Sequence, residues 1–206
     1  MAMEGEGYSL RRYRTQTDAD LKSFRVTVKE TDLLIRVDKA GYREGLVSEV
    51  ETLILRNRSL LEDYIKEDPA FASSLAPYLV GPEAPLIARR MVLAANPAGV
   101  GPMAAVAGVF AALTGDFLRQ SCREVIVENG GDIYLASNKK RLVAILAGSS
   151  PFNNRLALEV PSGTRPFGVC TSSGSVGPSL SLGRADAAVV LSHDVPLADA
   201  VATATA

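Results

Sequence analysis

The stretch of sequence that decides the fold reads Val125-Ile-Val-Glu-Asn-Gly-Gly-Asp-Ile-Tyr-Leu135. Its apolar residues at 125–127 and 133–135 are good strand formers, and a polar, glycine-containing hinge separates them. Asn-Gly is a strong signal for a tight hairpin turn. Gly130-Gly131 can also adopt positive φ and let a ligand approach the backbone closely. The segment therefore fits either a plain hairpin or a binding site that displays the two carboxylates and the amide of the hinge.

Periodicity on the N-terminal side of this segment predicts one hairpin and several helices. Alternating residues from Phe24 to Val37 predict a hairpin around Glu30-Thr31-Asp32. Apolar residues at helical spacing predict helices from Tyr42 to Lys66 and from Ala84 to about Ala95. The small and apolar run from Val100 to Leu113 predicts a tightly packed helix, whose glycine-rich start can bind an anion such as phosphate.

The C-terminal half is expected to be rich in strands. Strands are predicted at 125–127, 133–135, 142–146, 156–160, 168–170 and 187–191, and a closing helix begins near Pro196. Because helices and strands do not alternate regularly, this order favours an α+β fold with a mixed or antiparallel sheet and packed helices. We expect a single domain over 1–206, with a helical part at about 40–120 and a strand-rich part at about 121–206.

Composition excludes several classes of protein. Lys and Arg total 22 against 23 Asp and Glu, so neither nucleic acid nor an anionic membrane is an expected partner. No secretion signal is recognisable, and the longest apolar tract is shorter than the roughly 20 residues of a membrane span. The two cysteines are far apart, which argues against a zinc site or disulfide framework and favours the cytoplasm. The single histidine, His193, argues against a Ser/His/Asp hydrolase.

Two further segments carry groups that can do chemistry. Gly168-Val-Cys-Thr-Ser-Ser-Gly-Ser-Val-Gly177 is a strand that runs into four hydroxyls and two glycines, which can hold phosphate or form an ordinary surface loop. In a helix that opens at Pro196, Asp199 and Thr203 stand four residues apart on one face. Their oxygens can share a cation such as Mg²⁺, although this spacing also occurs without any metal.

These segments resemble the ApbE family. Asn129–Ile133, Thr171–Gly174 and Pro196–Thr203 follow the order of its Gly-Gly-Asp-Ile, Thr-Ser-Gly and Leu-Ala-Asp-Ala-x-x-Thr elements. The run from Gly99 to Gly174 is more similar still to a compact group of ApbE-related prokaryotic proteins of unassigned function. The resemblance implies an ApbE-like fold.

The resemblance also implies an activity and a set of ligands. ApbE proteins are flavin transferases that cleave FAD at its pyrophosphate with Mg²⁺ and attach FMN to a Thr hydroxyl of an acceptor protein. A small-molecule nucleotide and an acceptor protein are thus the implied partners. The implied nucleotide-binding residues are Asn129, Gly130, Gly131, Asp132, Thr171, Ser172, Ser173 and Gly174. The implied Mg²⁺ ligands are Asp199 and Thr203, with a backbone carbonyl near Ala105 or Val106.

The chain departs from the family pattern at two places. Val106-Ala107-Gly108 stands where the family has Ala-Lys-Gly, and 177–183 replaces a His-Ile-Ile-Asp-Pro stretch. No catalytic residue is therefore assigned, and Asp186 or His193 remains a candidate for proton transfer. The sequence supports a flavin or nucleotide-diphosphate binding protein with Mg²⁺-dependent FMN transferase or FAD-hydrolysing activity. The alternative is a noncatalytic ApbE-like ligand-binding or structural protein.

Overall fold

The computed structural model describes residues 19–153, 155–174 and 183–206. Its main sheet contains β1 (Leu21–Val28), β2 (Thr31–Asp38), β3 (Val125–Asn129), β4 (Asp132–Ala136), β7 (Phe167–Ser172) and β8 (Ala188–Ser192). These strands lie in the order β1-β2-β3-β4-β7-β8, and each neighbouring pair is antiparallel. A second, two-stranded sheet is formed by β5 (Arg141–Ala144) and β6 (Ala157–Val160).

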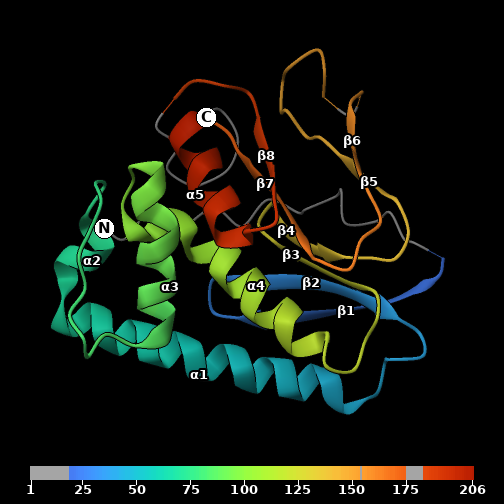
Figure 1. Cartoon of the computed structure of the whole chain (residues 1–206), viewed down its shortest axis with the longest axis horizontal. Coiled ribbons are helices and arrows are strands. Elements are labelled where there is room, and N and C mark those ends of the chain that lie inside the picture. The colour runs from blue at the N-terminus through green and yellow to red at the C-terminus, as the bar shows by residue number, and fades with distance from the viewer. Residues whose placement is uncertain (1–18, 154, 175–182) are drawn as a thin grey trace, which may run out of the picture.

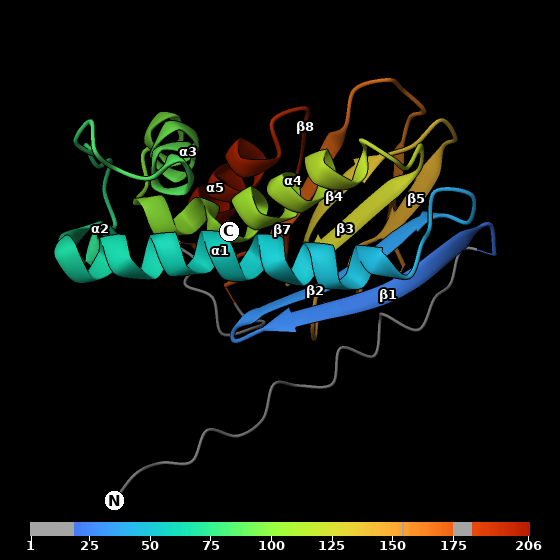
Figure 2. The same ribbon diagram turned by 90° about the horizontal axis from the view of Figure 1, so that it is seen from below.

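Helices cover one face of the main sheet. They are α1 (Gly45–Glu67), α2 (Pro69–Ser73), α3 (Leu86–Ala95), α4 (Val106–Leu118) and α5 (Val195–Thr205), with short 3-10 turns η2 (Asn96–Ala98) and η3 (Pro102–Ala105). Helix α4 packs on β3 and β4, and α5 packs on β7 and β8 (Figure 1). Helix α1 runs beside β1 and α4 (Figure 2). The predicted α+β class with an antiparallel sheet is confirmed.

Both faces of β3 are buried, which explains its near-continuous apolar sequence. Val125 and Val127 belong to the core shared with the helices. Ile126 points to the opposite face, where it packs with Leu135 and with Val160 of β6. Successive side chains of a strand alternate between faces, so β3 needs apolar residues at every position between two covering layers.

The predicted hairpins are present, with one change of turn. Asn129 pairs with Asp132 across a two-residue turn, in which Gly130 and Gly131 adopt φ of 69° and 113°. The hairpin interpretation of the hinge is therefore confirmed. The expected turn at Glu30-Thr31-Asp32 is wrong, because Thr31 and Asp32 already pair in β2 and Lys29 adopts φ of 52°.

The predicted helix from Val100 to Leu113 is also shifted. Helix α4 begins only at Val106, after the separate turn η3. A methyl group on Gly101 would lie 1.8 Å from the carbonyl oxygen of Ser74, so packing against that segment fixes an extended backbone before the helix. The free N–H groups of the helix start therefore lie near Ala107 and not at the glycines before it. The other predicted elements begin and end within a few residues of their observed bounds.

In the described ranges no single helix is long and apolar enough to cross a membrane. The bent pair Leu86–Ala98 and Pro102–Leu118 meets that test by length and composition only.

Candidate functional site

The first two predicted segments lie side by side. Strand β4 pairs with β7 through Ile133 and Val169, which brings the hinge of the first hairpin to the end of β7. A methyl group on Gly131 would lie 3.5 Å from the carbonyl oxygen of Thr171. The Cys170 side chain and the Thr171 N–H lie at the carboxylate of Asp132 and lower its pKa. The sheet register thus joins 129–132 to 171–174.

Helix α5 brings Asp199 to the start of α4. The Gly108 N–H donates to Asp199 Oδ2 at 2.7 Å, and the Ala107 N–H donates to the same carboxylate. A methyl group on Gly108 would lie 2.8 Å from Asp199 Cβ and 3.1 Å from Pro196 Cα, so only glycine permits this approach. Asp199 therefore caps α4 and interacts favourably with its dipole, a role that the sequence pattern alone did not reveal.

Asn129 holds the hairpin against the same helix start. Its Nδ2 donates to the carbonyl oxygen of Ala107 at 3.0 Å. The turn itself is closed by the Gly131 N–H, which donates to Glu128 Oε1 at 3.0 Å. Asn129 and Glu128 are both buried, and these contacts give them a part in positioning the hinge.

Asp132 and Asp199 form a buried pair of carboxylates, which we call the acid pair. Their exposed fractions are 8% and 7%. Burial raises the pKa of Asp132 to about 7, the donors Cys170 and Thr171 lower it, and the charge of Glu128 raises it. Burial, followed by the charge of Asp132, raises the pKa of Asp199 well above its usual value, against the lowering effect of its N–H donors. The acid pair is therefore a place where negative charge is costly.

Cys170 lies next to the acid pair as a protonated thiol. It is fully buried and its Sγ is 3.6 Å from the carbonyl oxygen of Val195. Burial, and then the charges of Asp132 and Asp199, raise the pKa of this thiol well above its usual value. A thiol with a raised pKa is a poor nucleophile.

The remaining predicted ligands are less buried than the acid pair. Thr203 follows Asp199 by one turn on α5 and is half-buried. Ser172 and Ser173 are half-buried, and the Gly174 N–H donates to the Ala185 carbonyl at 2.9 Å. This end of the loop approaches the C-terminal end of α5, because Gly174 packs on Gly183, and Gly183 packs on Ala206.

The structure shows contacts for one of the two candidates for proton transfer, His193, and leaves the loop before the other, Asp186, outside the described ranges. His193 Nδ1 is 2.7 Å from the carbonyl oxygen of Pro166, and its ring lies on Phe167 with centroids 4.1 Å apart. The structure therefore ties His193 to the loop before β7. Asp186 lies after the loop at 175–182, and those eight residues, which hold most of the replaced His-Ile-Ile-Asp-Pro stretch, are outside the described ranges.

No group of three or more His, Cys, Asp or Glu side chains in the described part of the chain is arranged to hold a metal ion. A cation at the acid pair would need oxygen ligands of other kinds as well, such as a hydroxyl, a carbonyl, a phosphate or water.

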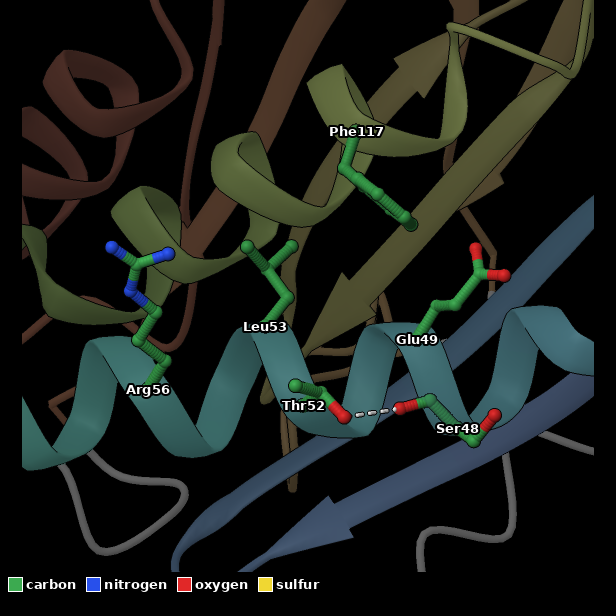
Figure 3. Close-up of a pocket in the computed structure, with 6 residues that line it drawn as sticks. All are labelled: Ser48, Glu49, Thr52, Leu53, Arg56 and Phe117. Atoms are coloured by element: carbon green, nitrogen blue, oxygen red, sulfur yellow. Dashed lines mark hydrogen bonds between the residues drawn. The ribbon is translucent and has the colours of Figure 1, made fainter.

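A separate hollow of about 420 Å³ lies between α1 and α4. In Figure 3, Leu53 and Phe117 point into the space between the two helices, with Arg56 and Glu49 to either side. Phe117 lies near the C-terminal end of α4, whereas Asp199 contacts the N-terminal end. This hollow is therefore distinct from the predicted nucleotide site.

Solved structures with a similar fold are flavin transferases. The apo form of flavinyl transferase ApbE from Pseudomonas stutzeri aligns with a TM-score of 0.53 and 14% identity, over 89% of this chain and 84% of that chain. A variant of the flavin transferase ApbE from Vibrio cholerae aligns with a TM-score of 0.53 and 15% identity, over 90% and 86% of the two chains. At this identity the likeness establishes the fold.

Sequence comparisons place the chain in a family. A UPF0280 protein from Methanocella arvoryzae is 42% identical over 184 residues, which cover 89% of this chain and 73% of the relative. A UPF0280 protein from Methanosarcina barkeri is 44% identical over 178 residues, which cover 86% and 68%. The family model described as "AbpE bacteria" matches residues 13–206. The chain therefore belongs to this ApbE-like family, whose archaeal relatives carry the name UPF0280.

Proposed function

We propose that this chain binds FAD or a related nucleotide diphosphate together with Mg²⁺ at the acid pair, and transfers FMN to a hydroxyl acceptor or hydrolyses FAD. The observation that carries this proposal is the convergence of three distant segments. The β3–β4 hairpin, the end of β7 and helix α5 meet around Asp132 and Asp199. The fold shared with two ApbE flavin transferases supports the same conclusion.

The groups at the acid pair fit a magnesium ion. Mg²⁺ prefers oxygen ligands and usually combines one or two carboxylates with waters and substrate phosphates. Asp132 Oδ1 is buried without a hydrogen-bond partner, and the neighbouring Asp199 is also buried. Asp199 and Thr203 would hold the ion. When bound, Mg²⁺ supplies neutralisation of the diphosphate charge.

The polypeptide itself would position the nucleotide. Gly130 is exposed and Gly131 is half-buried, so their backbone is open to close approach by a ligand without side-chain interference. Thr171, Ser172 and Ser173 stand at the end of β7, and the Thr171 carbonyl lies next to this turn. Their hydroxyls would contact the phosphates. Asn129 would act indirectly, because its amide is used to fix the hairpin on Ala107.

A second candidate function, nucleotide binding without transfer, has its own supporting observations. Ala107 occupies the position of the family lysine. His193, one candidate for proton transfer, is engaged with Pro166 and Phe167. Cys170 is a buried, protonated thiol. These features favour a site that binds the nucleotide but turns it over slowly or not at all.

Ligand-induced stabilisation tests the proposal. Thermal midpoints are measured with FAD, FMN, ADP or no nucleotide, each with Mg²⁺ or EDTA. A ligand at 100 times its Kd stabilises the native state by about 2.7 kcal/mol, or roughly 5–10 °C for a chain of this size. We expect a Mg²⁺-dependent rise with FAD that is lost in Asp199→Ala and retained in Asp63→Asn, an exposed aspartate on α1. No shift with any nucleotide would refute flavin binding.

Release of AMP from FAD separates the two candidate functions. Mg²⁺-dependent formation of AMP, with FMN either free or attached to a hydroxyl acceptor, supports the enzyme. A thermal shift without AMP release supports the noncatalytic binding protein.

A further inference from the structure

Asp132 is oriented into the protein and has one oxygen left without a partner. The sequence pattern placed it among residues that line a nucleotide, but its side chain is buried beside Cys170. The Cys170 side chain and the Thr171 N–H lie at this carboxylate and favour its charged form, whereas Oδ1 accepts no hydrogen bond. A buried carboxylate oxygen without a partner costs folding free energy, so it calls for an explanation.

A second acid interacts with Asp132. Asp199, which faces Asp132 closely enough for their charges to interact, is held by the N–H groups of Ala107 and Gly108. The acid pair is thus surrounded by backbone N–H groups and a neutral thiol, and among the described residues no Lys or Arg side chain is one of its hydrogen-bond donors. Two buried carboxylates among neutral groups are stabilised in their charged form when a positive ion binds to them.

The chemistry of the neighbouring groups indicates which ion. Cys170 is fully buried and its Sγ donates to the Val195 carbonyl oxygen at 3.6 Å, so it presents a bound proton and not a thiolate sulfur. The ligands on offer are carboxylate oxygens, which suit Mg²⁺ or Mn²⁺ better than the thiolate-seeking Zn²⁺. The Asn129 contact with Ala107 holds the hairpin and the start of α4 together, so both carboxylates lie on elements fixed to one another.

We propose that Asp132 is a direct ligand of the divalent cation, so that the β3–β4 hairpin and helix α5 each contribute one carboxylate. This inference rests on the proposed function for the presence of a cation, and it adds a ligand to the pair Asp199 and Thr203. It also reassigns Asp132 from the nucleotide to the metal.

Cation binding can be measured without nucleotide and without turnover. Mn²⁺ is titrated into the full chain and free Mn²⁺ is followed by electron paramagnetic resonance, for the wild type, Asp132→Asn, Asp199→Asn and Asp63→Asn. We expect each substitution at the acid pair to weaken Mn²⁺ binding by roughly tenfold or more. Asp63→Asn removes the same charge from an exposed position on α1 and is expected to bind Mn²⁺ like the wild type.

Stability in EDTA distinguishes loss of a ligand from loss of structure. The neutral Asn side chain removes the charge repulsion within the acid pair, so the thermal midpoint of Asp132→Asn in EDTA should equal or exceed that of the wild type. Its Mg²⁺-induced rise should disappear. Asp132→Glu retains a carboxylate and should recover part of the Mn²⁺ affinity lost in Asp132→Asn.

Three outcomes would overturn the inference. If Asp132→Asn binds Mn²⁺ like the wild type while Asp199→Asn does not, Asp132 is no ligand and the proposed function still stands. If Asp132→Asn melts well below Asp63→Asn in EDTA and Asp132→Glu recovers no binding, Asp132 serves structure alone. A wild type that binds FAD equally well in EDTA, with no Mn²⁺ affinity, would contradict the cation itself and leave nucleotide binding intact.

Discussion

The contact between α4 and α5 can be tested at Gly108. In Gly108→Ala the new Cβ would lie 2.8 Å from Asp199 Cβ, 3.0 Å from the Val195 carbonyl oxygen and 3.1 Å from Pro196 Cα. These atoms belong to the backbone or are bonded directly to it, so no side-chain rotation relieves the overlap and α5 must move. Overpacking of this kind costs about 1–3 kcal/mol, of which alanine recovers up to about 1 kcal/mol through helix propensity.

We therefore expect Gly108→Ala to lose about 1–2 kcal/mol in urea unfolding, or roughly 2–8 °C in thermal midpoint. Because α5 carries Asp199, the Mg²⁺-dependent shift with FAD should shrink as well. Gly81→Ala is the matched control, since a Cβ at that exposed position meets no atom within 4 Å. The tight contact would be refuted if Gly108→Ala unfolded at the same urea concentration as Gly81→Ala and kept the full ligand shift.

Three further predictions concern single side chains. Asn129→Ala leaves the Ala107 carbonyl without its 3.0 Å hydrogen bond, and urea unfolding should show a loss of about 1–3 kcal/mol. Burial raises the pKa of Asp132 to about 7, so the metal-free native state holds more protons than the unfolded state between about pH 4 and 7. The free energy of unfolding should therefore fall as pH rises through that window, and it should fall less in Asp132→Asn. Burial raises the pKa of Asp38, but backbone N–H donors lower it below its usual value overall. The stability that Asp38 contributes is therefore present above about pH 4 and lost on further acidification. Asp38→Asn should be less stable than the wild type at neutral pH and lose less stability on acidification, as followed by circular dichroism.

Local sequence signals were enough for the hairpins and the long helix. Alternating apolar residues and the Asn129-Gly130 turn specify β3–β4 through neighbours alone. Helix α1 shows a continuous helical period, and its observed bounds, Gly45–Glu67, lie close to those predicted. The start of α4 could not be found in this way, because the small apolar run before it carries no local cap and the capping carboxylate belongs to Asp199 on another helix.

The direction of the Asp132 side chain was equally hidden in the sequence. In a sheet with one wet face, alternation would tell which residues point inward. Here both faces of the β3–β4 hairpin are covered, so a polar residue has no default orientation. The residues of the candidate site could thus be grouped by resemblance. Their separate roles required the tertiary contacts, which make Asp199 a helix cap, Asn129 the anchor of the hairpin and Asp132 a carboxylate with one unpartnered oxygen.

Another buried carboxylate in the same chain shows how unusual the acid pair is. Glu124 is also 8% exposed, but it accepts hydrogen bonds from Arg141 at 3.1 Å and from the Asn138 N–H at 2.8 Å. Burial raises the pKa of Glu124, and these partners with Ser137 lower it below its usual value overall. This structural carboxylate thus pairs with a guanidinium group, and both of its oxygens accept hydrogen bonds. Asp132 has neither a cation nor a partner for Oδ1, and the dipole at the start of α4 offsets only about 0.3–2 kcal/mol of the charge on Asp199. In the metal-free protein the acid pair holds negative charge only at a cost, whereas a divalent cation would give it the positive partner that Arg141 gives to Glu124.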